Sequence, residues 1–151
     1  MSFSAERVKL SVSLDRFLQA QELVFLKALT ELQAGRKSSH WMWIIFPQLK
    51  GLGSSLTAEY YGINGLAEAQ AYVSDPILGT RLIRCVTALM AHAGKPLEEI
   101  FAYPDNLKFC SSMTLFNKVA GTDSIFQDAI DAFCIEADSR TLQMLEDAAG
   151  E

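Results

Sequence analysis

Hydrophobic positions repeat with helical spacing along much of the chain. The clearest stretch is 14–32, where apolar side chains recur every three or four residues and form one stripe. Asp15 lies at its start and Gly35 just beyond its end, and these residue types favour a helix start and a helix end. The pattern therefore predicts a helix here. Residues 1–13 have only a weak period and are predicted to form an N-terminal arm.

Capping and breaking residues divide the rest of the chain into shorter helical segments. Asp75 and Pro76, for example, supply an N-cap and a first helical residue. The predicted segments are 54–61, 66–73, 76–94, 96–102, 104–116, 125–135 and 142–145. No alternation of apolar and polar residues between hairpin turns is found. The sequence thus predicts an all-α fold, a single compact multi-helix domain over 14–147 with about eight helices, several of them short.

The run 41–46 holds six apolar residues in a row, and it is too short for its period to separate a buried strand from a buried helix. Pro47 ends either element. If the run is helical, Trp41 and Trp43 point roughly 200° apart. We then expect one ring in the core and the other facing a cleft, and not both rings on one cavity wall.

Composition and charge narrow the class of protein. The chain has 151 residues, of which 50% are hydrophobic and 21% are charged, as in a globular single domain. A net charge of −5 argues against the broad electrostatic contact of non-specific nucleic-acid binding. No apolar run approaches the roughly 18 residues of a membrane span, and the N-terminus lacks a secretory signal. We therefore expect neither a nucleic-acid nor a membrane partner.

Cysteine and histidine spacing offers no local metal or redox motif. Cys85, Cys110 and Cys134 are widely separated without a C-x-x-C pair, and His40 and His92 are far apart. The sequence predicts no metal site and no cofactor. We expect the three thiols to be reduced, as in a cytoplasmic protein, and to pack as small buried side chains.

Two short runs carry a family resemblance. The first is His40-Trp41-Met42-Trp43 followed by Phe46-Pro47-Gln48, and the second is Ser111-Ser112-Met113-Thr114-Leu115-Phe116. Together they resemble the signatures of a bacterial family catalogued as domain of unknown function eighteen-ten, over roughly residues 14–145. The resemblance implies one compact helical domain without an assigned biochemical role. Family members are sometimes labelled calpastatin-like, but calpastatin is extended and disordered, whereas this composition is globular.

The first of these runs lies among residues able to bind an anion. Lys37 precedes it, and the glycine-rich loop leading to Ser54 offers backbone N–H groups and a hydroxyl near a helix start. His40 suits acid–base chemistry, or it orients a neighbouring ring by a hydrogen bond. Trp43 either stacks on a planar ligand or packs in the core. Gln48 is an amide in an apolar setting, which bonds to backbone or contacts a ligand.

The second run follows a charged pair. Asp105, Lys108 and Ser112 share one helix face, and a serine–lysine pair can act as nucleophile and base. The alternative is an Asp–Lys pair on a helix whose hydroxyls bond back to helix carbonyls. Ser111 and Thr114 add two more hydroxyls between apolar residues. Buried hydroxyls need partners, so they either tie helices together or line a polar pocket.

We hypothesise that these two segments converge on one cavity that binds, or acts on, a small planar anionic ligand such as a nucleotide or nucleotide fragment. The candidate ligand-binding residues are Lys37, His40, Trp43, Gln48, Ser54, Lys108, Ser111, Ser112 and Thr114. The alternative is a non-enzymatic protein-interaction or homodimerisation module, with a second copy as partner. Whether the protein is an enzyme stays open at this stage.

Overall fold

The computed structural model describes residues 2–121 and 123–149, with side chains from residue 14 onward. Within these residues it contains helices and no strands, which confirms the predicted all-α single domain. The elements are α1 (Ser2–Ala34), α2 (Met42–Ile45), α3 (Leu56–Tyr60), α4 (Leu66–Ser74), α5 (Leu78–Met90), α6 (Leu97–Ile100), α7 (Asp105–Ala120), α8 (Ile125–Phe133) and α9 (Ser139–Ala149). No helix in this described part combines the length and apolar character needed to cross a bilayer.

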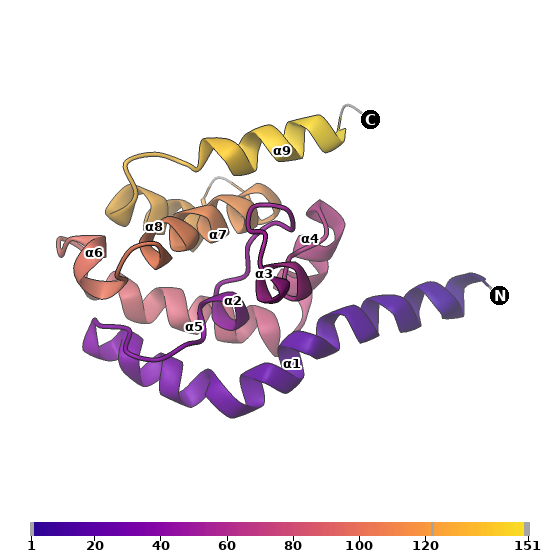
Figure 1. The fold of residues 1–151 in the computed structure, drawn as a ribbon, viewed down its shortest axis with the longest axis horizontal. Helices are drawn as coiled ribbons and strands as arrows, with labels where there is room; N and C mark the ends of the chain where they lie inside the picture. Colours follow the sequence, from indigo (N-terminus) through magenta and orange to yellow (C-terminus); the bar gives the residue numbers. More distant parts are fainter. Residues whose placement is uncertain (1, 122, 150–151) are drawn as a thin grey trace.

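The long helix α1 forms one side of the molecule and packs against α5 and α2 (Figure 1). It begins at Ser2, so all but the first residue of the predicted arm lies on the same helix as the apolar stripe. Its N-terminal part extends beyond the other helices. The helix is followed by Gly35 in a left-handed conformation, with φ of 76°. A Cβ there would approach the His92 ring to 2.9 Å, so the position requires glycine.

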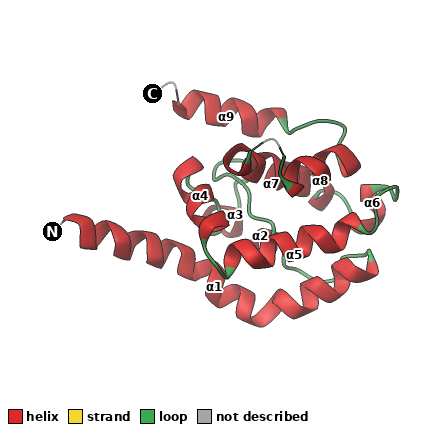
Figure 2. Cartoon of the chain, turned by 180° about the vertical axis from the view of Figure 1, so that it is seen from behind, coloured by secondary structure: helices red, strands yellow, loops and turns green. Residues whose placement is uncertain are grey.

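Helix α7 lies at the centre of the packing. It contacts α4, α8, α9, α2 and α6, and Figure 2 shows it between α9 and the layer that contains α5. Phe109, Met113 and Phe116 are fully buried along it. Its first turn reaches the surface, where Asp105 and Lys108 are partly exposed. The core therefore fixes α7 firmly while its charged first turn stays available to solvent.

The ambiguous apolar run forms the short helix α2, with Trp41 at its N-cap. Trp41 and Phe46 both pack near Phe101, and the ring centroids of Phe46 and Phe109 lie 5.1 Å apart in an edge-to-face arrangement. Such aromatic pairs stabilise a core beyond their buried area. This cluster joins the first signature run to α7, which carries the second.

A disulfide corrects one sequence expectation. Cys110 on α7 is bonded to Cys134, which follows α8, across 24 residues of sequence. The prediction of reduced thiols is wrong for this pair, because only the packing of α7 against α8 brings the two residues together. Cys85 is free and fully buried, as expected of a small apolar side chain. Burial raises the pKa of its thiol to about 12, which disfavours the thiolate that nucleophilic chemistry requires.

Candidate functional site

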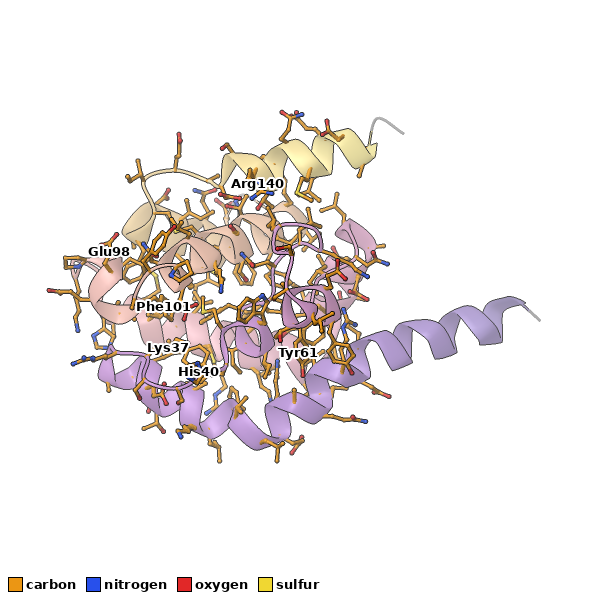
Figure 3. The ribbon with its side chains drawn as sticks, viewed as in Figure 1. Lys37, His40, Tyr61, Glu98, Phe101 and Arg140 are labelled. Atoms are coloured by element: carbon orange, nitrogen blue, oxygen red, sulfur yellow. A yellow bond between two sulfur atoms is a disulfide. The ribbon has the colours of Figure 1, made fainter. Side chains whose placement is uncertain are left out.

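A cavity of about 240 Å³ lies where the segment after α1 meets α2, α3 and the first turn of α7. Lys37 and His40 come from the segment between α1 and α2, which Figure 3 shows with both side chains labelled. Asp105 comes from α7. The lining residues are Lys37, His40, Trp41, Met42, Trp43, Ile44, Thr57 and Asp105. The cavity thus joins the segment around α2 to the first turn of α7, which contributes Asp105.

Two lysines share one carboxylate at this cavity. Lys37 Nζ lies 2.8 Å from Asp105 Oδ2, and Lys108 Nζ lies 3.6 Å from Asp105 Oδ1. The Lys37 side chain is only 11% exposed, so its pairing with Asp105 is largely shielded from water. Two positive charges against one negative charge leave this group one unit positive. Such a group attracts an anion, and water screens it less than a pair on an open surface.

Each lysine also lies over a tryptophan ring. Lys108 Nζ is 3.5 Å from the Trp43 ring centroid, and Lys37 Nζ is 5.2 Å from that of Trp41. Trp41 is buried, and its indole N–H donates to Glu31 Oε1 at 2.9 Å. The indole Nε1 of Trp43 is also buried, but it has no acceptor among the described residues. Trp43 therefore presents a donor whose partner the described part of the chain does not supply.

The expectation that only one tryptophan lines a cavity is wrong. Both Trp41 and Trp43 contribute to the wall. Trp41 is at the N-cap, with φ of −148° and ψ of 10°, so it lies outside the helical turn and the 200° separation does not apply. The other half of that expectation is confirmed, because Trp41 is in the core while Trp43 is partly exposed at the cavity.

A carboxylate that is not among the predicted site residues shapes the segment before α2. Glu31, in the last turns of α1, accepts hydrogen bonds from the backbone N–H groups of Ser38 and Ser39, from the Ser39 hydroxyl and from the Trp41 indole. Burial acts to raise the pKa of Glu31, but these bonds outweigh it and lower the pKa from 4.5 to about 2. Glu31 thereby fixes the residues on either side of His40.

A signal for Glu31 exists in the sequence. A buried anion in the last turns of a helix opposes the helix dipole, so it needs compensation from elsewhere. Glu31 has this position, directly before Leu32 of the apolar stripe. For Thr57, in contrast, we find no sequence signal. Its place at the cavity depends on how the 49–63 segment folds back and carries α3 with it.

Four of the predicted ligand residues lie together. Lys37, His40 and Trp43 line the cavity, and Lys108 lies beside it through its contacts with Trp43 and Asp105. The other five lie elsewhere: Gln48, Ser54, Ser111, Ser112 and Thr114 do not line it. Ser54 is exposed and lines none of the cavities described for this protein.

The hydroxyls of α7 are engaged within the fold. Ser111 donates to the Leu107 carbonyl, and Thr114 donates to the Cys110 carbonyl while accepting from the Asp138 N–H. Ser112 is fully buried, and its hydroxyl has no partner among the described residues. The bonds of Ser111 and Thr114 to helix carbonyls match the alternative given for this run, in which its hydroxyls bond back to carbonyls of their own helix.

Residues able to hold a metal do not gather in the described part of the chain. No group of three or more His, Cys, Asp and Glu side chains there has a metal-binding arrangement. The polar groups at or beside the cavity are two ammonium groups, one carboxylate, an imidazole, the Thr57 hydroxyl and an indole N–H.

Comparisons with known proteins agree with this fold. The chain matches the family model described as "Protein of unknown function (DUF1810)" over residues 11–145. It is also similar to the crystal structure of the conserved hypothetical protein Rv1873 from Mycobacterium tuberculosis, with 46% sequence identity and a TM-score of 0.85. That match covers 88% of this chain and 96% of the other. No curated protein matches the chain. The chain therefore belongs to the DUF1810 family, the family that its two signature runs resemble.

Proposed function

We propose that the cavity binds a small planar ligand that carries an anionic group, such as a nucleotide or a nucleotide fragment. The observation that carries this proposal is the sharing of Asp105 by Lys37 and Lys108, which leaves one positive charge beside Trp43. The unpartnered indole N–H of Trp43 adds a donor for an oxygen of the ligand. His40 is exposed at the same cavity and supplies a further polar contact.

The size of the cavity limits the ligand. Its volume of about 240 Å³ lies below the roughly 300–1,000 Å³ of pockets for drug-sized ligands. A mononucleotide fragment fits this limit better than a dinucleotide. The anionic group would lie near Lys37 and Lys108, and the planar group would lie near the Trp43 ring, where tryptophan stacking on bases is favourable.

Titration calorimetry tests the proposal with a nucleoside monophosphate, the matching nucleoside and inorganic phosphate as three separate probes. We expect the monophosphate to bind more tightly than either part. Lys108→Gln should weaken its binding by about tenfold, because a charge-assisted hydrogen bond contributes roughly 1.5–3 kcal/mol. The control is Lys118→Gln, which removes the same charge from an exposed site on the same helix. Equal effects of the two variants, or no binding at millimolar ligand, would contradict the proposal.

A second candidate function is homodimerisation, and one surface observation favours it. Leu23 and Leu26 lie three residues apart on α1 and are 86% and 73% exposed. Two large apolar side chains on one helix face suit a self-complementary contact, in which α1 of one copy packs against α1 of a second copy. This function is compatible with the ligand cavity, because neither leucine lines it.

A further inference from the structure

A second cavity of about 240 Å³ lies among α6, the first turns of α7 and the segment that follows α8. Asn106, Leu107 and Cys110 of α7 line this second cavity, whereas Asp105 lines the candidate nucleotide site. The two cavities thus share a helix but no lining residue. The residues of the second are Leu97, Glu98, Asn106, Leu107, Cys110, Phe133, Cys134, Ile135, Glu136, Ala137, Asp138 and Ser139.

One residue of the second cavity carries a buried acceptor without a donor. Asn106 is only 9% exposed, and its side-chain Oδ1 is buried with no hydrogen-bond partner among the described residues. Leaving such an oxygen unpaired costs free energy, and folded proteins rarely do so. Because Asn106 lines the cavity, a molecule bound there with an N–H group can supply the missing bond.

The charge around this acceptor is negative. The charged residues that line the cavity are Glu98, Glu136 and Asp138, all of them acidic. The Asp138 carboxylate already accepts two bonds from Thr141, but no ion pair of Glu98 or Glu136 occurs within the described residues. Figure 3 shows Glu98 at the edge of the molecule, on α6. Two carboxylates without an ion pair, and one acceptor without a donor, favour a ligand that carries a cationic N–H group.

The remaining walls are apolar. Leu97, Leu107, Phe133 and the Cys110–Cys134 disulfide contribute apolar surface to the cavity. Leu107 is 54% exposed, so its side chain is accessible from outside. An alkyl chain packs well on such a surface while its charged end stays near the carboxylates, as lysine and arginine stems do in proteins.

We propose that this second cavity binds an alkylguanidinium or alkylammonium group. The cationic head donates to Asn106 Oδ1 and pairs with Glu98 and Glu136, and the alkyl stem lies against Leu107 and the disulfide. The cavity volume of about 240 Å³ lies below the usual range of roughly 300–1,000 Å³, which favours a small ligand. Its source is either a free amine or an arginine or lysine side chain of a peptide.

Titration calorimetry with three probes distinguishes these sources. The probes are agmatine as a free amine that carries both a guanidinium and an ammonium group, N-acetyl-arginine amide as a peptide side chain, and butylurea as a neutral analogue. We expect saturable binding of one or both guanidinium probes, and binding of agmatine alone would assign the site to free amines. The proposal is overturned if neither guanidinium probe binds at millimolar concentration, or if butylurea binds as tightly.

Matched variants separate the site from the net charge of the protein. Glu98→Gln combined with Glu136→Gln should weaken binding by about tenfold, and both residues are exposed, so the fold should tolerate the change. Asn106→Ala should weaken it too, with thermal unfolding measured alongside. The control, Glu59→Gln combined with Glu146→Gln, removes two exposed acids that line neither cavity and should have no effect. An equal loss of binding in this control would show that the effect comes from the overall charge of the protein, and it would refute the site.

Discussion

Single residues set the geometry of the candidate site, and Glu31 shows how. Its carboxylate lies in the last turns of α1 and accepts four hydrogen bonds from residues 38, 39 and 41. His40 lies between these donors, so its place at the cavity depends on a residue that does not line the cavity itself. Substituting Glu31 would therefore alter both the stability of the protein and the wall of the site.

The pKa of Glu31 predicts a pH dependence. The folded state lowers this pKa from 4.5 to about 2, so the stabilisation is complete above about pH 5 and is lost as the pH falls towards 2. Glu31→Gln should lower the free energy of unfolding at neutral pH by about 3 kcal/mol. In chemical denaturation, the difference between the variant and the wild type should shrink steadily between pH 5 and pH 2.

The control for this experiment is Glu59→Gln, which changes an exposed acid on α3. It should leave the free energy of unfolding nearly unchanged, because exposed substitutions are usually within about 0.5 kcal/mol. A Glu31→Gln variant as stable as this control at neutral pH would show that the four bonds do not hold the segment.

Helices and their connections were predictable to different degrees. The helix over 14–32 follows from its apolar stripe, and Ser55 and Ser124 cap α3 and α8 as the residue types indicate. The sequence does not decide between a strand and a helix for the run 41–46, because the four helical residues are too few to show a helical period. The site was predictable as two polar segments, but the group that joins them, Asp105 between two lysines, depends on packing.

The disulfide connects two elements of the fold, and its contribution to stability can be predicted. It ties α7 to the segment after α8 and closes a loop with a sequence separation of 24 residues. A loop of this length predicts a stabilisation of about 3 kcal/mol. Cys110→Ser combined with Cys134→Ser should lower the unfolding free energy by that amount, and a reductant should have the same effect on the wild type.

The double serine variant also serves as the control, since the reductant should not change its stability. Cys85 is buried and free, so it should not respond in either protein. A wild type whose unfolding curve is identical with and without reductant would show that Cys110 and Cys134 do not form a bond in solution.

At the scale of the whole molecule, the proposed homodimer depends on the exposed leucines Leu23 and Leu26 of α1. We predict that the wild type elutes as a dimer of 16.7 kDa chains in size exclusion with light scattering. Leu23→Lys combined with Leu26→Lys should give monomers, because two charged side chains then replace the exposed leucines of the proposed interface. Leu56→Lys, at another exposed leucine, is the control. A wild type that is monomeric at high concentration would rule out this contact.

Two cavities lie against the same helix, α7, and the charged residues around them differ in sign. The first carries two lysines on one carboxylate, and the second is lined by carboxylates without a cation. The two proposals thus place ligands of opposite charge on different faces of the first turns of α7. An anionic probe should not compete with agmatine, which makes the two proposals independent in experiment.

The two indole N–H resonances report on whether distant segments form one anion-accepting cavity beside Trp43. Trp41 donates to Glu31, whereas Trp43 has no acceptor among the described residues. During titration with a nucleoside monophosphate, we predict a saturable shift of the Trp43 indole N–H resonance and a much smaller shift for Trp41. If the Trp43 resonance stays in place at saturating millimolar ligand, or if both move equally, the account is wrong.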